Sequence, residues 1–250
     1  MGKLRRKISI STRLREDGAY EGRAVVEDDF HHFRVGVIVR DGHVASTYTQ
    51  SPRAPTRLCP AAGSQLKLIE GMPLERASTA VHAYTDARHQ CTHMFDLAGL
   101  VVAAIARRTP GRAYEAEVED EESDKPRMAR LWRDGKLVYE WELENTGRIK
   151  SPPPFSGRSL GGGYTGWARE TFSEEDAEAA LVLRRAVFIS GGRNIDLDDP
   201  ARRTGPVGGC WVFQPERMDN AIRNVGSTQD FTDRRDDLLS CDSDWLAFSG

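Results

Sequence analysis

Residues 27–44 read EDDFHHFRVGVIVRDGHV and carry the pattern on which the fold prediction depends. The apolar alternation of FRVGVIV is typical of a β-strand. An Asp-Gly pair follows, which is a common two-residue hairpin turn, so residues 33–50 are predicted to form a β-hairpin. Adjacent side chains of a strand point to opposite faces, so we expect only one of His31 and His32 to reach a given site.

Similar patterns extend outward on both sides of this hairpin. Alternating residues predict strands over 4–29 and again within 109–150, where a second Asp-Gly turn occurs. Helices are predicted over 61–69, 91–108 and 173–190. The helix over 91–108 is apolar nearly all round, which indicates a buried helix.

These elements predict an α+β fold in one compact domain, residues 1–250. Its parts are an α/β unit at 20–108, a β-hairpin segment at 109–150 and a wrapping helical and irregular segment at 151–250. The Pro- and Gly-rich stretch SPPPFSGRSLGGGYTGW opens the wrapping segment. Its aromatic residues indicate that it packs against the domain and is no free linker.

The composition excludes several classes of protein. The net charge is −3 and the charges are mixed along the chain, so no basic surface for nucleic acid or an anionic membrane is expected. No apolar run is long enough to span a membrane, and the N-terminus lacks the apolar core of a secretory signal. Four cysteines without an export signal indicate cytoplasmic thiols. A small-molecule substrate is expected, and a homo-oligomer is an open alternative.

The histidines are confined to one part of the chain. All six lie between positions 31 and 93, and two of the four cysteines, Cys59 and Cys91, lie in the same window. Cys59 precedes a predicted helix, and Cys91 and His93 open the buried one. Free N–H groups at a helix N-terminus favour thiolate, the form that binds metal. Two thiolates with one or two imidazoles suit Zn²⁺ or iron, so this window is predicted to hold a metal or a proton-transfer site.

The alternative is that these residues are structural. The chain has no C-x-x-C pair and no H-E-x-x-H motif, and a buried cysteine commonly behaves as a small hydrophobic residue. Cys210 and Cys241 have no histidine nearby in the sequence and are predicted to be structural.

Six motifs resemble the signatures of a bacterial family catalogued as a domain of unknown function. They are EDDFHHFRV, EGMPL, TDARHQCTHMFDLAGL, SPPPFSGRSL, AALVLRRAVFIS and GSTQDF, spread over most of the chain. The lone Cys59 ahead of a helix belongs to the same pattern. This resemblance implies a role in degradative metabolism of acyl, aromatic or terpenoid compounds and names no reaction.

Residues 30–106 also resemble the NifU/IscU-type iron–sulfur cluster scaffold fold. The resemblance implies that His32, Cys59 and Cys91 occupy its three ligand positions. A histidine stands where that family has its first cysteine and aspartate, so a three-cysteine cradle is absent. The resemblance therefore implies a retained Zn²⁺ or Fe²⁺ ion, with His31 or His93 as a fourth ligand.

Roles follow for the residues beside these ligands. Asp86, Asp96 and His93 are candidate catalytic groups, because each could orient a ligand or act as a general base. Arg57 and Arg88 are candidates for binding a substrate carboxylate or phosphate, with an ordinary surface role as the alternative.

The sequence therefore predicts a metal-dependent enzyme, a lyase, hydrolase or isomerase, acting on a small organic or acyl substrate. The alternative is a metal or iron–sulfur binding accessory protein without catalysis.

Overall fold

The computed structural model describes residues 2–122, 125–144, 147–199, 205 and 207–249. These residues contain eight β-strands together with helices, so the prediction of an α+β protein is confirmed. The chain divides into two compact units. The β2–β4 unit comprises Ile8–Arg112, Leu197–Gln229 and Leu239–Gly250, and the β5–β8 unit comprises Met1–Lys7, Ala113–Asp196 and Asp230–Leu238.

The predicted subdivision only partly follows these units. The predicted α/β unit, 20–108, falls inside the β2–β4 unit, whereas the predicted wrapping segment, 151–250, is divided between both units. A single domain stays a prediction. Within the described residues, no helix combines the length and the apolar character that crossing a membrane requires.

The strands of the β2–β4 unit follow the order β4-β3-β2-β1. Their bounds are β1 Lys3–Leu14, β2 Tyr20–Asp28, β3 His32–Arg40 and β4 His43–Arg53. The predicted hairpin is β3 with β4, and its turn residues Asp41 and Gly42 have φ angles of 51° and 74°. These positive φ angles are typical of an Asp-Gly hairpin turn. β2 pairs antiparallel with β3, and Glu27 lies opposite His32.

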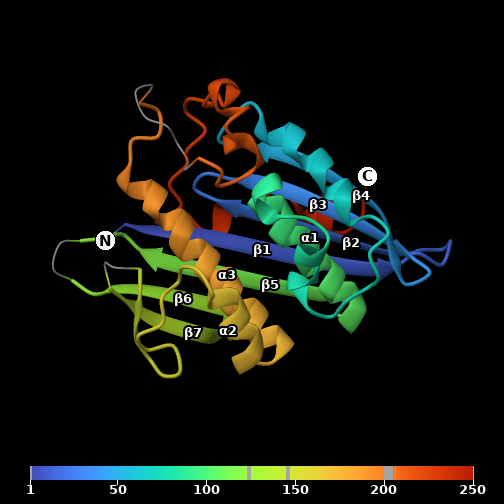
Figure 1. Cartoon of the computed structure of the whole chain (residues 1–250), viewed down its shortest axis with the longest axis horizontal. Coiled ribbons are helices and arrows are strands. Elements are labelled where there is room, and N and C mark those ends of the chain that lie inside the picture. Colours follow the sequence, from blue (N-terminus) through green and yellow to red (C-terminus); the bar gives the residue numbers. More distant parts are fainter. Residues whose placement is uncertain (1, 123–124, 145–146, 200–204, 206, 250) are drawn as a thin grey trace. The chain divides into compact units, whose positions relative to one another are not determined.

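Helix α1 (Thr92–Arg107) packs on one face of β2 and β3, as Figure 1 shows. It is the predicted buried helix, and its residues from Met94 to Ile105 are buried except for Asp96. Gly22 of β2 permits the close approach, because a Cβ atom there would lie 2.4 Å from the Val101 side chain. The N-terminal end of α1 is thereby brought to the corner between β2 and β3.

The remaining segments of this unit are short. The predicted helix over 61–69 is the 3₁₀ helix η1 (Cys59–Ile69). The others are η2 (Ser78–Ala83), η3 (Ala87–His89), η5 (Trp211–Phe213), η6 (Met218–Asn220) and α4 (Ser243–Leu246). α4 packs against β2, and in Figure 1 the red C-terminal segment lies behind the blue strands while α1 lies in front of them.

The β5–β8 unit has the strand order β1-β5-β6-β7-β8. Its elements are β5 Gly111–Glu119, β6 Arg127–Arg133, β7 Lys136–Leu143, β8 Ile149–Ser151, α2 Tyr164–Thr171, α3 Glu174–Ser190, η4 Gly191–Asn194 and η7 Arg235–Asp237. The predicted Ser173 cap is present, because its Oγ accepts a hydrogen bond from the Asp176 backbone N–H at 3.2 Å. α3 packs on β6 and β7.

Candidate functional site

The corner between β2 and β3 directs its two imidazoles to opposite faces of the sheet. His32 lies opposite Glu27, and its Nε2 is 2.9 Å from Asp242 Oδ2 in the C-terminal segment. His31 lies instead against α1, where its ring stacks on His93 with the ring centroids 3.8 Å apart. The two side chains therefore lie on opposite faces, as expected from the sequence. The alternation of side chains along an extended chain is the cause.

His31 is held by a buried carboxylate. Asp28 Oδ1 accepts hydrogen bonds from the backbone N–H groups of Phe30 and His31, each at 2.9 Å, and lies 2.9 Å from His31 Nδ1. A carboxylate acceptor at Nδ1 keeps the ring proton there and leaves the lone pair on Nε2. The His31 side chain is 12% exposed and that of Asp28 is fully buried. Asp28 therefore fixes the orientation of the His31 ring.

Three free cysteines from distant segments meet beside the N-terminal end of α1. Cys91 is its N-cap residue, Cys59 opens η1, and Cys210 directly precedes η5. The Trp211 backbone N–H donates to the Gln90 carbonyl at 2.9 Å, which brings the chain at Cys210 beside the chain at Cys91. η1 and η5 also pack against each other.

Burial raises the pKa of two of these thiols. It raises the pKa of Cys91 to about 12, and the neighbouring Cys59 adds to the effect, although the N–H groups of Met94 and His93 act in the opposite direction. Burial also raises the pKa of Cys59, against a hydrogen bond of 3.1 Å with Thr56 Oγ1. The expectation that the helix N-terminus favours thiolate is therefore wrong without a metal, because desolvation outweighs the helix N–H groups.

On the opposite face, His32 bridges two buried carboxylates. Its Nδ1 is 3.5 Å from Glu27 Oε1, and its Nε2 is 2.9 Å from Asp242 Oδ2. Arg53 Nη2 lies 3.2 Å from Glu27 Oε1, and Arg34 Nε lies 2.6 Å from Asp242 Oδ1. Two carboxylates and two guanidinium groups thus pair around one imidazole.

This cluster, Glu27 with His32 and Asp242, is a group of three buried side chains whose ligand atoms lie within 4.8 Å of one another. In the described part of the chain, the possible ligand atoms of His32, Cys59 and Cys91 do not all lie within 4.8 Å of one another. The structure therefore does not bring the three predicted ligands together, because His32 faces the other side of the sheet. The cluster also does not fit a divalent ion. Its carboxylates are already neutralised by arginines, and its two ring nitrogens face different carboxylates.

The C-terminal segment that supplies Asp242 is fixed to this face by several contacts. The Leu239 backbone N–H donates to Glu27 Oε2 at 2.8 Å, and Arg23 Nη1 donates to the Trp245 carbonyl at 3.1 Å. The Arg23 guanidinium also lies 4.7 Å from the Trp245 ring centroid. Burial acts to raise the pKa of Asp242, but the hydrogen bonds and charges of His32 and Arg34 outweigh it, so that pKa is lowered.

Of the other predicted residues, Asp86 and Arg88 pair with each other. Asp86 is exposed and accepts hydrogen bonds from the Arg88 backbone N–H at 2.9 Å and from Arg88 Nη2 at 2.6 Å. These bonds lower the pKa of Asp86 to about 2, which is unsuited to a general base near neutral pH. Arg57 is exposed ahead of η1, and Asp96 is half-buried on α1.

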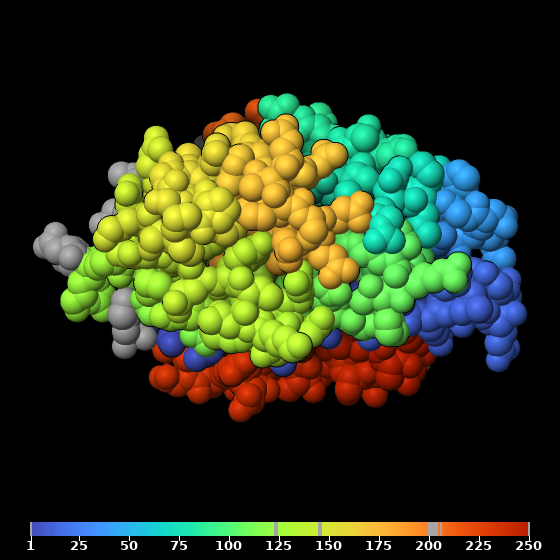
Figure 2. Space-filling view, turned by 90° about the horizontal axis from the view of Figure 1, so that it is seen from below, coloured from blue at the N-terminus to red at the C-terminus, as the bar shows by residue number. Residues whose placement is uncertain are grey.

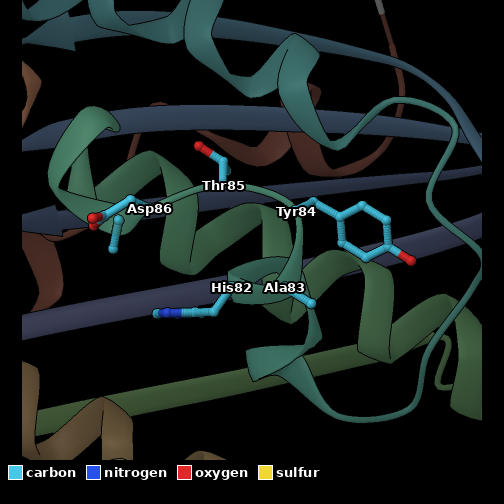
Figure 3. Close-up of a pocket in the computed structure, with 6 residues that line it drawn as sticks. His82, Ala83, Tyr84, Thr85 and Asp86 are labelled. Carbon is cyan, nitrogen blue, oxygen red and sulfur yellow. The ribbon is translucent and has the colours of Figure 1, made fainter.

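An open pocket of about 490 Å³ lies along residues 82–87. Figure 3 shows the His82 and Asp86 side chains on one side of this loop and the Tyr84 ring on the other. Because these side chains diverge, they do not form a common site.

Sequence reasoning missed Cys210 and Asp242 and gave no role to Glu27 or Asp28. The acidic run beside the two histidines was a usable signal for Glu27 and Asp28, since carboxylates commonly orient imidazoles. Nothing local pointed to Cys210 or Asp242, because each is brought in from far along the chain.

No protein-family model matches the chain, and no curated protein matches it. Membership of the bacterial family and the likeness to the iron–sulfur scaffold therefore stay predictions. The two clusters, the cysteines beside His31 and His93 and the group of Glu27, His32 and Asp242, are the features that bear on function.

Proposed function

We propose that the protein is a metal-dependent enzyme whose Zn²⁺ or Fe²⁺ ion is held by Cys59, Cys91 and Cys210, and that it acts on a small organic or acyl substrate. The observation that carries the proposal is the meeting of three free cysteines beside the imidazole pair of His31 and His93. Degradative metabolism is the proposed setting, from the family resemblance.

The chemistry of the three thiols suits such an ion. Soft thiolate ligands select zinc and iron, and a bound ion deprotonates the thiols that coordinate it. Cys59 and Cys91 are neutral when no cation is nearby, because burial raises the pKa of both thiols. Their sulfur atoms do not form a group within 4.8 Å, so binding requires rotation of the cysteine side chains.

The imidazole pair supplies the proton-transfer groups. Asp28 orients His31 through Nδ1, so His31 Nε2 is the atom that accepts a substrate proton. His93 stacks on this ring and follows Cys91 by two positions, so it links the imidazole pair to the thiols. A bound ion would polarise a carbonyl group or activate water. The arginine, carboxylate and His32 cluster on the opposite face takes no part.

A second candidate is a metal or iron–sulfur binding accessory protein. Cys210 favours it, because three thiols with neighbouring imidazoles can hold a transferable metal or cluster. The resemblance of residues 30–106 to the scaffold fold supports the same reading. The hairpin, a cysteine opening η1 and a cysteine before α1 occur in the expected order.

The test is metal analysis of protein purified under anaerobic, reducing conditions. We expect close to one zinc or iron per chain. Cys59→Ser, Cys91→Ser and Cys210→Ser should each lower the metal content at least about tenfold, since each removes one thiolate ligand. The matched control is Cys241→Ser, because Cys241 is exposed. His32→Gln is the second control, because His32 belongs to the other face.

Two results decide between the readings. Metal that survives prolonged dialysis against a chelator favours the enzyme, whereas metal that passes rapidly to the chelator favours the accessory protein. Wild-type protein without metal, together with normally folded cysteine variants, would contradict both proposals and leave the cysteines as core residues.

A further inference from the structure

One cysteine of the proposed metal site has a polar side chain in direct contact with its sulfur. Thr56 Oγ1 lies 3.1 Å from Cys59 Sγ, and the Cys59 backbone N–H donates to the Thr56 carbonyl at 3.2 Å. Both residues belong to the stretch after β4, and Figure 2 shows the cyan and teal residues of that stretch gathered in one part of the surface. Thr56 is fully buried and Cys59 is 7% exposed, so the hydroxyl and the sulfur meet away from water.

The backbone around Thr56 is held by a segment from far along the chain. Thr56 forms an antiparallel bridge with Arg223. The Asn224 backbone N–H donates to the Pro55 carbonyl at 3.0 Å, and Arg223 Nη1 donates to the same carbonyl at 3.1 Å. The tertiary structure thus keeps the backbone of Thr56 in place beside Cys59.

The direction of the hydrogen bond depends on the state of the sulfur. A thiol and a hydroxyl can each donate to the other. A sulfur that coordinates a metal ion has lost its proton, so the hydroxyl becomes the donor. A hydrogen bond to a charged acceptor is about twice as strong as one between neutral groups. The Thr56 hydroxyl therefore interacts more strongly with a metal-bound Cys59 than with its free thiol.

We propose that Thr56 is a positioning residue of the metal site, whose hydroxyl donates to the Cys59 thiolate when Zn²⁺ or Fe²⁺ is bound. This inference rests on the proposed function, because it requires Cys59 to be a ligand. Partners of this kind orient metal ligands, and their removal commonly lowers metal affinity about ten- to hundredfold. Thr56 holds the Cys59 sulfur, so the side-chain rotation that metal binding requires falls to Cys91 and Cys210.

The alternative is that Thr56 only fills space beside η1. Two substitutions separate these roles. Thr56→Val keeps a similar volume and removes the hydroxyl, whereas Thr56→Ser keeps the hydroxyl and removes the methyl group. A packing role makes Thr56→Ser the more harmful change for metal binding, and a hydrogen-bonding role makes Thr56→Val the more harmful one.

The test is Co²⁺ binding to the full chain, freed of metal with a chelator and kept reduced and anaerobic. Co²⁺ bound to thiolate absorbs in the near ultraviolet by charge transfer from sulfur, so one titration gives both the affinity and the band position. We expect Thr56→Val to bind Co²⁺ about ten- to hundredfold more weakly than the wild type. Its band should lie at longer wavelength, because the sulfur lone pairs lose a hydrogen bond. Thr56→Ser should keep both values close to those of the wild type.

The matched control is Thr12→Val. Thr12 lies in the same unit, and its hydroxyl donates to the Thr109 carbonyl at 2.9 Å, so a hydroxyl hydrogen bond is lost without a sulfur partner. This variant should bind Co²⁺ as the wild type does. Should Thr56→Val fail to fold, Thr56→Ala is compared with Thr56→Ser, because alanine and serine differ only by the hydroxyl oxygen.

Three results overturn the proposal. Wild-type affinity and band position in Thr56→Val would show that the hydroxyl takes no part, while loss of Co²⁺ binding in Cys59→Ser would still uphold the metal site. A larger loss in Thr56→Ser than in Thr56→Val would assign Thr56 to packing. Wild-type protein that binds no Co²⁺ would overturn this inference together with the proposed function.

Discussion

His31 and His32 are neighbours in the sequence, yet their imidazoles occupy opposite environments. On the α1 face, His31 contacts one buried carboxylate, Asp28, and one stacked imidazole, His93, which follows the buried thiol of Cys91 by two positions. On the C-terminal face, His32 lies between two carboxylates that arginines already neutralise. A step of one position along the chain thus places the two imidazoles in different chemical surroundings.

The difference shows what each face can do. Where charges are paired, the side chains are committed to holding the C-terminal segment on the sheet, and a further cation would be unfavourable. On the α1 face, the thiols of Cys59 and Cys91 are buried, and the metal ion is proposed there. The four predictions below test this contrast, beginning with the largest expected effect.

Thiol reactivity should separate the buried cluster from the surface. In the metal-free folded protein at pH 8, Cys91 should react with iodoacetamide about a thousandfold more slowly than exposed Cys241. The reason is burial, which raises the pKa of Cys91 to about 12. Peptide mass spectrometry over time measures both rates, and urea-unfolded protein is the control, in which the rates should converge. Similar rates in the folded protein would place Cys91 at the surface.

Removing one carboxylate from the other face should destabilise the fold. Asp242→Asn removes the charged partner of His32, which is buried, and of Arg34, which is half-buried, so the free energy of unfolding should fall by about 3 kcal/mol. Urea unfolding at pH 7 measures the change. Asp244→Asn is the matched control, because Asp244 is exposed in the same segment, and it should change stability by less than about 0.5 kcal/mol. Equal effects of the two substitutions would refute the paired cluster.

The contribution of Asp242 should also depend on pH in a defined direction. Its folded-state pKa lies below the ordinary value of 3.8, because His32 and Arg34 outweigh the opposing effect of burial. A lowered carboxyl pKa contributes stability that is complete above about pH 5 and is lost as the pH falls through the folded-state value. The difference in unfolding free energy between wild type and Asp242→Asn should therefore be fully present at about pH 5 and shrink below about pH 4. A difference that grows on acidification would contradict this assignment.

The smallest expected effect concerns a phenol beside the same face. Tyr48 donates to Glu21 Oε1 at 2.6 Å, and burial together with that carboxylate raises the pKa of Tyr48 to about 12. Tyr48→Phe should cost about 1 kcal/mol, with Tyr84→Phe as an exposed control. In an ultraviolet titration, the variant should lose one of the late-ionising phenols, a group in which burial also places Tyr139 and Tyr164, whose pKa values are raised as well. Loss of an earlier-ionising phenol would show that Tyr48 is more exposed than the structure has it.

Much of the fold could be predicted from local patterns. The Asp-Gly turns, the alternating strands, the Ser173 cap and the buried helix all follow from interactions within a few residues, and each is present. The prediction of separate faces for His31 and His32 holds for the same reason, because alternation is a property of any extended chain. Among the described residues, the structure does not bring His32 together with Cys59 and Cys91, although the sequence had led us to expect it.

The sequence by itself determined the elements, the hairpin register and the gathering of histidines into one part of the chain. Only the tertiary structure decided which residues meet them. Cys210 reaches Cys91 through a backbone hydrogen bond between distant segments, and Asp242 reaches His32 because the C-terminal segment packs on β2. Burial, which no local pattern reveals, then reversed the expected ionisation of the Cys91 thiol at the start of α1. Local hydrogen bonding fixes what each segment becomes, whereas long-range packing and desolvation fix the chemical state of its side chains.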